Sequence, residues 1–234
     1  MSTSAQSLPS EKIKVIACAT VIEEMLALMP ENVDYEILNF GLHMVPKNLK
    51  AVLQEAIDLS GKTYGTIILG YGLCSLAVVG LQSQYCTLVV PKVEDCIAIY
   101  LGSSQVYSKQ RKREPGTYYL TKGWIEVSDT ILDEYQRIVK KYDKEKADFI
   151  LGKMLKHYNR LVYINTGTEN QDKYRSYALE VAQQFNLRFE EIRGSSTLIQ
   201  KMVYGPWDNE FVVVPPGHKI TYRDFKEPRT VSNL

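Results

Sequence analysis

The sequence predicts an α/β protein of two Rossmann-like β-α-β-α-β lobes, with mainly parallel sheets and a cleft between their carboxyl edges. The first observation is that short apolar, β-branched runs alternate with segments of helical periodicity. The second is that this alternation occurs twice, in the first hundred residues and again after residue 160. Because such alternation forms parallel sheets through right-handed crossovers, and 234 residues suffice for two lobes, each half is expected to form one lobe.

The first lobe is predicted over residues 13–125, after a flexible N-terminus at 1–12. Its strands are expected at 13–18, 33–40, 66–69 and 87–90, and its helices at 22–29, 47–59 and 103–113. Pro46 suits the first turn of the second helix, and Gly61 follows the end of that helix. Residues 115–124, rich in aromatic side chains between glycines, are expected to form a hairpin or an ordered loop.

The second lobe is predicted over residues 126–218, followed by a tail at 219–234 that could return to the first lobe. Its helices are expected at 129–142, 146–158, 172–185 and 197–202, and its strands at 160–165, 187–192 and 210–214. Asp129 is expected to cap the first of these helices. The order of these elements matches that of the first lobe, which indicates a structural duplication.

Composition and charge exclude several classes of function. Lys and Arg total 28 against 27 Asp and Glu, so no global field attracts nucleic acid or an anionic membrane. The N-terminus lacks a basic segment followed by an apolar one, and no apolar run approaches the roughly 18 residues of a membrane span. The sequence therefore predicts a cytoplasmic protein that acts without membrane or nucleic acid. In that compartment its four cysteines are expected to be free thiols or metal ligands.

Three cysteines follow predicted strands, which favours a metal centre. Cys18, Cys74 and Cys96 each come after an apolar strand, whereas Cys86 precedes one and is expected at the opposite edge. In a flavodoxin-like strand order the three thiols converge at one edge. Because neighbouring strands lie about 4.8 Å apart, ligands on three of them span on the order of 10 Å. That breadth suits an iron-sulfur cluster better than a single zinc ion.

Two alternatives to the cluster stay open. His43 follows the second strand and could reach the same edge, which would give a zinc site of cysteine and histidine ligands. An open coordination position on either metal centre would act as a Lewis acid or hold a substrate sulfur or oxygen. In the second alternative no metal is bound, and the cysteines are small buried hydrophobic residues. The absence of a C-x-x-C pair from the sequence favours this interpretation.

The residues around these positions carry motifs that are specific in combination. They are Ile16-Ala-Cys18, Leu42-His43-x-x-Pro46-x-x-Leu49, Tyr71-Gly-Leu-Cys74, Pro91-Lys-x-x-Asp95-Cys96-Ile97 with Leu101-Gly-Ser103, and Gly116-Thr-Tyr-Tyr-Leu-Thr-x-Gly123-Trp124. Over about residues 13–217 this combination resembles the family known as domain of unknown function 1638. The resemblance implies that related proteins occur in anaerobic bacteria and methanogenic archaea, together with corrinoid-dependent methyl-transfer systems. It also implies a role in one-carbon or sulfur metabolism. It implies no defined activity, but it marks five motif positions: Cys18, His43, Cys74, Asp95 and Cys96.

Further polar residues lie in turns that follow predicted strands. Asp95 could orient a metal ligand or move a proton, or it is a turn residue, and His43 is the second candidate catalytic residue. The substrate-binding candidates occupy the turns of both lobes: Gly102, Ser103, Asn165, Thr166, Arg193 and Ser195. The turn at Gly102, with the basic run after it, could bind an anion. Helix capping is the alternative explanation for each turn.

The leading hypothesis is a metal-dependent transferase or lyase that acts on a small molecule held between the lobes. Its reaction would transfer or remove a methyl or sulfur-containing group, with iron-sulfur favoured over zinc. Tyr118, Tyr119 and Trp124 could form a wall or lid over the cleft. The second hypothesis is a non-catalytic partner of a corrinoid protein or methyltransferase, which would supply any corrinoid; an exposed aromatic patch at Trp124 would favour it. A periplasmic-type small-molecule binder is the third.

Overall fold

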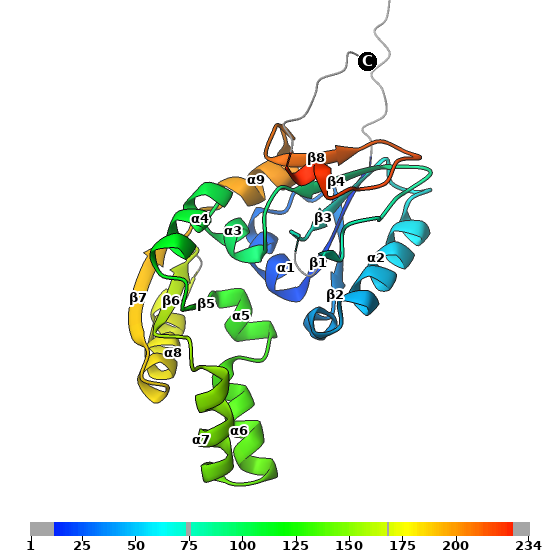
Figure 1. The fold of residues 1–234 in the computed structure, drawn as a ribbon. Coiled ribbons are helices and arrows are strands. Elements are labelled where there is room, and N and C mark those ends of the chain that lie inside the picture. Colours follow the sequence, from blue (N-terminus) through cyan, green and yellow to red (C-terminus); the bar gives the residue numbers. More distant parts are fainter. Residues whose placement is uncertain (1–11, 74–75, 168, 227–234) are drawn as a thin grey trace, which may run out of the picture.

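The computed structural model describes residues 12–73, 76–167 and 169–226. Its elements in chain order are β1 (Ile13–Cys18), α1 (Ala19–Met25), η1 (Leu26–Leu28), β2 (Val33–Leu38), η2 (Phe40–Met44), α2 (Pro46–Ser60), β3 (Thr66–Gly70), β4 (Thr87–Pro91), α3 (Cys96–Tyr100), α4 (Ser104–Arg113), β5 (Thr117–Leu120), α5 (Lys122–Val127), α6 (Ile131–Lys141), α7 (Lys144–Met154), β6 (Arg160–Asn165), α8 (Gln171–Gln184), β7 (Arg188–Arg193), α9 (Thr197–Tyr204), β8 (Phe211–Val214) and η4 (Arg223–Phe225). Figure 1 shows two sheets, with α5 between them and the α6–α7 hairpin projecting away from both. The predicted α/β class is confirmed.

The first sheet has the strand order β2-β1-β3-β4-β8, in which β1 to β4 run parallel. As predicted for a flavodoxin-like lobe, β1, β3 and β4 are neighbours, so the chain leaves all three at the same edge. Their sequences, IKVIAC, TIILG and TLVVP, are almost entirely buried. Such continuous apolar strands are typical of a parallel sheet covered on both faces.

The last strand of the first sheet comes from the far end of the chain. β8 pairs antiparallel with β4, with Phe211 opposite Pro91 and Val214 opposite Leu88. The assignment of 210–214 to the second lobe was therefore wrong. An apolar run indicates a buried strand but not its partner, and here the run covers the open edge of β4. The tail does return to the first lobe, where Ile220 N–H donates to the carbonyl of Leu81.

The second sheet consists of β5, β6 and β7 in sequence order, all parallel. The prediction of a hairpin or an ordered loop at 115–124 is wrong, because 117–120 is a single strand and Thr121 then caps α5 by accepting from Trp124 N–H. β5 pairs with β6, and not with a second strand within residues 115–124. The second sheet therefore begins inside the range assigned to the first lobe.

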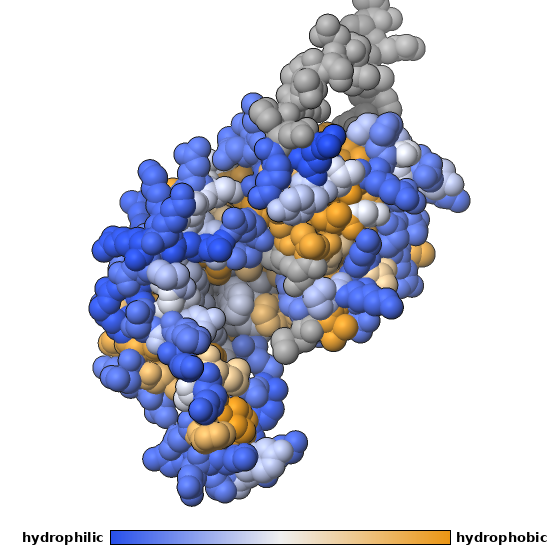
Figure 2. Space-filling view, in the orientation of Figure 1, coloured by the Kyte–Doolittle hydropathy of each residue, from blue (hydrophilic) through white to orange (hydrophobic). Residues whose placement is uncertain are grey.

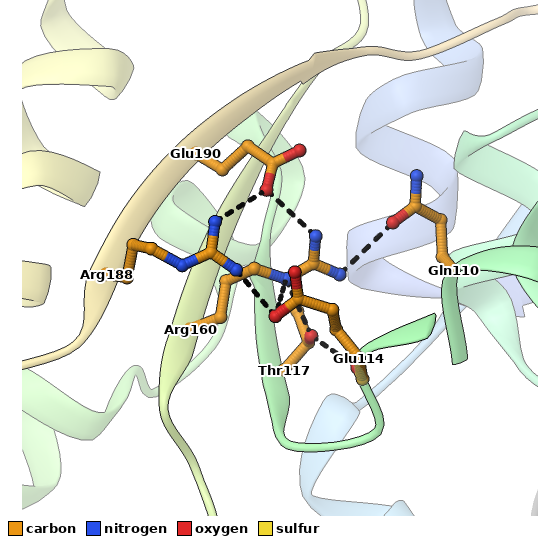
Figure 3. Close-up of polar contacts among 6 residues, drawn as sticks. All are labelled: Gln110, Glu114, Thr117, Arg160, Arg188 and Glu190. Atoms are coloured by element: carbon orange, nitrogen blue, oxygen red, sulfur yellow. Dashed lines mark hydrogen bonds and ion pairs between the residues drawn. The ribbon is translucent and has the colours of Figure 1, made fainter. Parts of the chain in front are cut away.

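A buried arginine joins these strands to α4. Arg160 is fully buried, and its guanidinium donates to Thr117 Oγ1 (2.9 Å), Glu190 Oε2 (2.9 Å) and Gln110 Oε1 (3.1 Å). Figure 3 shows this network, which also includes Glu114 and Arg188. Because a buried charge is tolerated only when it is paired and hydrogen-bonded, the network fixes the amino ends of the three strands against α4.

The helix boundaries follow local capping. Pro46 occupies the first turn of α2, as predicted. Thr130 rather than Asp129 caps α6: its side chain accepts from Asp133 N–H, and the Asp133 carboxylate accepts from Thr130 N–H in a reciprocal capping box. Asp129 instead pairs with Arg137. Within the described residues, none of the helices combines the length and the apolar character that crossing a bilayer requires.

A buried carboxylate connects the two lobes. Glu24, on α1, is 4% exposed. One of its oxygens accepts from Gly123 N–H of α5 (2.8 Å), and the other accepts from the Thr166 hydroxyl beyond β6 (2.6 Å). The neighbouring Glu23 pairs with Lys122 at 2.7 Å. Because both Glu24 oxygens are satisfied across the interface, this carboxylate holds the lobes in one relative position.

Candidate functional site

A cavity of about 310 Å³ lies where the first sheet meets β5 and α5. We call it the sulfur cavity. Its lining comes on one side from the end of β1, the segments after β2 and β4 and the start of α3, and on the other side from β5, α5 and the turn before β6. The lining residues are Cys18, Phe40, His43, Asp95, Cys96, Ile97, Thr117, Tyr118, Tyr119, Trp124 and Tyr158. Four of the five motif positions therefore line one cavity, as expected for residues at the carboxyl edge of a parallel sheet.

Cys18 ends β1 and lies at the start of α1, with 1% of its surface exposed. Its Sγ is 3.1 Å from Thr20 Oγ1, which accepts a hydrogen bond from the hydroxyl of the buried Tyr100. Thr20 and the nearby backbone N–H groups favour a thiolate, but burial is the larger effect and raises the pKa of the Cys18 thiol above 9.0. Cys18 is therefore a protonated thiol at neutral pH unless a cation binds beside it.

Cys96 is the first residue of α3, and Asp95 caps that helix. Asp95 Oδ1 accepts from Ile97 N–H at 3.0 Å, and Oδ2 accepts from the Tyr107 hydroxyl at 2.7 Å. Burial nevertheless raises the pKa of the Asp95 carboxyl, with these hydrogen bonds acting in the opposite direction. Asp95 thus fixes the start of α3, and with it the backbone of Cys96.

The pKa of Tyr100 is raised well above its ordinary value. Burial is the main cause, and the nearby Cys96 and Cys18 raise this pKa further.

Three polar atoms of the sulfur cavity are buried without a hydrogen-bond partner among the described residues. They are Nε2 of His43, Nε1 of Trp124 and the hydroxyl oxygen of Tyr119. The His43 ring lies between Phe40 and Tyr71, with centroid separations of 5.3 and 5.8 Å. Burial lowers the pKa of His43 below 6.5, so its imidazole is neutral at neutral pH. Because an unpaired buried polar atom costs free energy, these three positions favour a ligand that bonds to them.

The donor types fit a soft metal, although only part of the predicted ligand set is described. Thiolates such as those of Cys18 and Cys96 bind zinc and iron-sulfur clusters, and a neutral imidazole suits zinc. Within the described residues, no group of three or more histidine, cysteine or acidic side chains is placed to hold a metal ion. The third predicted ligand, Cys74, lies outside those residues. Cys86 precedes β4 at the opposite edge, as predicted, where its thiol contacts Ser83 Oγ.

The predicted substrate residues of the second lobe line a separate cavity of about 770 Å³. We call it the polar basin. Asn165, Thr166, Arg193 and Ser195 all belong to its lining. Among the residues described, Arg193 forms no ion pair. Thr166 donates to Glu24, so the basin adjoins the contact that joins the lobes. None of the described residues lines both the basin and the sulfur cavity.

Gly102 and Ser103 have structural surroundings that differ from those of the other four candidates. Gly102 has a φ of 71°, and a Cβ atom there would lie 2.6 Å from Ser195 Cβ, so the glycine permits the close approach of the two lobes. The Ser103 hydroxyl accepts from Gln105 and Val106 N–H at the start of α4. Its acceptor capacity is thus used for helix capping.

Sequence reasoning missed part of the cavity wall. Phe40 and Tyr158 line the sulfur cavity, and Phe40 packs edge-on against Trp124 with a centroid separation of 5.1 Å. Phe40 lies three residues before His43, so its proximity to a motif residue was an available signal. Tyr158 precedes β6, and the sequence contains no indication that this turn reaches the first lobe. The outcome is a cavity with mainly aromatic walls and sulfur at one side.

A model of the family described as "Protein of unknown function (DUF1638)" matches residues 37–203. This match covers more than half of the chain. The chain belongs to the DUF1638 family. The resemblance drawn from the motifs is thereby confirmed, and His43, Cys74, Asp95 and Cys96 fall within the matched range. Searches of the curated proteins and of the solved structures gave no match. For this DUF1638 protein, the chemistry of the site is therefore the basis for a functional proposal.

Proposed function

We propose that this DUF1638 protein is a metal-dependent enzyme that binds a small molecule in the sulfur cavity and transfers or removes a methyl or sulfur-containing group. The observation that carries the proposal is the convergence of Cys18, Cys96 and the unpartnered Nε2 of His43 on one aromatic cavity. Perturbed titratable groups beside an apolar pocket are typical of reaction sites. The volume of about 310 Å³ suits a compact substrate.

Cys18 and Cys96 would hold the metal. In the favoured form of the proposal Cys74 is the third ligand, of an iron-sulfur cluster; in the alternative form His43 is the third ligand, of a zinc ion. When bound, either metal centre would supply a Lewis acid with an open position for a substrate oxygen or sulfur. Because the pKa of Cys18 is raised by burial, metal binding must release the thiol proton, and metal affinity should rise with pH.

The remaining residues of the cavity would bind and orient the substrate. The rings of Phe40, Trp124 and Tyr158 give it apolar contact area and exclude water. Trp124 Nε1 can donate a hydrogen bond to a substrate oxygen. In the cluster form, where His43 is not a ligand, its neutral imidazole can accept a proton at Nε2 when a substrate thiol or hydroxyl is deprotonated.

The first experiment is metal and sulfide analysis, with an absorption spectrum, of protein purified without oxygen. Cys96→Ser is expected to lose the metal, whereas the matched control Cys86→Ser, on the opposite edge of the sheet, is expected to retain it. Iron and sulfide lost in Cys74→Ala but kept in His43→Gln would establish a cluster. Zinc that is lost in His43→Gln but kept in Cys74→Ala would establish the zinc site. Metal-free protein in all forms would contradict the metal-dependent proposal.

A second candidate is a non-catalytic accessory protein of a corrinoid-dependent methyltransferase system, with structural cysteines. It is favoured by the exposed apolar side chains of α7, where Phe149 is 61% and Met154 54% exposed. Figure 2 shows apolar surface at this hairpin. Trp124, by contrast, is partly buried against both cores rather than part of an exposed aromatic patch, which favours the enzyme. Metal-free protein would leave the accessory role as the better candidate.

A further inference from the structure

A separate cavity of about 470 Å³ lies between α4, the segment after β4 and the C-terminal turn η4. We call it the lysine cavity. Four lysines line it: Lys92, Lys109, Lys112 and Lys226. The one acidic residue in its lining is Glu94, and Arg111 forms an ion pair with that carboxylate. The lining of the lysine cavity therefore contains more cationic than acidic side chains, although the whole chain is almost neutral.

The charged groups on the α4 side are available for a ligand. Lys109 and Lys112 are three residues apart on α4 and so share a helix face with Gln105 and Ser108, which also line the cavity. Neither lysine forms an ion pair within the part of the chain that the structure describes. Like charges in one concavity repel each other, and an anion bound between them would remove that repulsion. Figure 2 shows the hydrophilic surface over α4.

The opposite wall is held in place by the returning C-terminal segment. Gly80 N–H donates to the carbonyl of Ile220 at 2.7 Å, and Ile220 N–H donates to the carbonyl of Leu81 at 2.9 Å. Beyond these bonds, η4 brings Phe225 and Lys226 to the lysine cavity, and Phe225 packs against the first core. The cavity thus presents the apolar ring of Phe225 as well as the ammonium groups of Lys109 and Lys112, which suits a ligand with both an anionic and an apolar part.

We propose that the lysine cavity binds a phosphorylated small molecule, with its phosphate held by Lys109 and Lys112 and its apolar part against Phe225. A phosphate carries a charge of about −1.5 to −2 and three strong acceptor oxygens at neutral pH, so it matches several ammonium groups better than a carboxylate does. Lysine is a common point-charge partner for phosphate. This inference does not depend on a metal in the sulfur cavity.

The test is isothermal titration calorimetry with inorganic pyrophosphate as the probe, at low and at physiological ionic strength. Wild-type protein should bind the probe, and the Lys109→Ala/Lys112→Ala variant should bind it at least ~10-fold more weakly, a difference of about 1.4 kcal/mol. Added salt should weaken binding, because exposed charges are screened. Both lysines are exposed, so the substitutions should leave the fold intact.

The matched control is Lys47→Ala/Lys50→Ala, which removes two exposed lysines at the same spacing on α2. This control is expected to bind pyrophosphate as wild type does. Absence of binding to wild-type protein would overturn the proposal. Equal weakening in both double variants would also overturn it, because a general charge effect would then explain the binding. Neither result depends on metal content, so this proposal and the metal proposal can fail independently.

Discussion

The Tyr107 hydroxyl donates a hydrogen bond of 2.7 Å to Asp95 Oδ2, and this bond connects the two cavities. Tyr107 lies on α4 and lines the lysine cavity, whereas Asp95 precedes Cys96 and lines the sulfur cavity. A displacement of α4 by a bound anion would therefore act on the residue that caps α3. The backbone at Cys96 is thus held by a capping residue whose hydrogen-bond partner, Tyr107, lines the neighbouring cavity.

Tyr107→Phe is expected to destabilise the protein by about 1.5–3 kcal/mol, the range for a hydrogen bond to a charged group. The variant keeps the ring but leaves Asp95 Oδ2 without this donor. Urea denaturation measures the change in the free energy of unfolding. The matched control is Tyr35→Phe, whose side chain is 46% exposed, and a change within ±0.5 kcal/mol is expected there. Equal effects of the two substitutions would contradict the importance of the bond.

His43 is expected to titrate below 6.5 because burial disfavours its charged form. At pH values between the lowered pKa of the folded state and the ordinary pKa of the unfolded state, the unfolded chain binds more protons at His43 than the folded chain does. The contribution of His43 to stability is therefore fully present above pH 6.5 and is lost as pH falls through the folded-state pKa.

NMR titration of the imidazole signal absent from His43→Gln measures this pKa directly. Urea denaturation of wild type and His43→Gln over the same pH range measures the stability difference. A pKa at or above 6.5 would show that the imidazole is not desolvated in the cavity.

Gly102→Ala is expected to lower the free energy of unfolding by more than the ~1–2 kcal/mol that a left-handed backbone costs an L-residue. The new Cβ atom would lie 2.6 Å from Ser195 Cβ, in addition to the strain at a φ of 71°. Ser195→Gly should relieve the contact but not the backbone strain. A double-mutant cycle should therefore show favourable coupling between the two substitutions. Strict additivity would indicate that the lobes separate slightly to accommodate the methyl group.

Arg160→Met is expected to cost about 3–5 kcal/mol, because it leaves the Glu190 carboxylate and Thr117 without their buried partner. Arg160→Lys keeps the charge but cannot reproduce the three directions in which the guanidinium donates (Figure 3), so it should also destabilise. Chemical denaturation of both variants tests this. The control Arg175→Met removes an exposed ion pair with Glu191 and should change stability by less than ~1 kcal/mol.

The elements that depend on local patterns were predictable from the sequence. β1 and β3 are continuous apolar runs, and Pro46 marks the start of α2, so their positions followed from periodicity and backbone chemistry. The convergence of Cys18 and Cys96 on one cavity also followed, because the carboxyl ends of parallel strands share an edge.

Long-range partners were not predictable in this way. The pairing of β8 with β4 and the contact of Tyr158 with the sulfur cavity depend on which surfaces remain uncovered after the local elements form. The same limit explains why the sequence did not show that the substrate-binding candidates of the second lobe lie in a different cavity from the cysteines. Arg193 ends β7, Ser195 follows that strand, and both line the polar basin, whereas the wall of the sulfur cavity nearest the second sheet comes from β5. A turn motif identifies polar groups but not the cavity that they face.

The antiparallel β8 makes the first lobe discontinuous along the chain. During synthesis, β1 to β4 leave the ribosome about 120 residues before β8, so the edge of β4 stays open while the second sheet is made. Such pairing between distant segments slows folding, and an unpaired strand edge is a template for association with other chains. A fragment ending at residue 125 should therefore aggregate, and a chaperone that shields β4 should raise the yield of the intact protein.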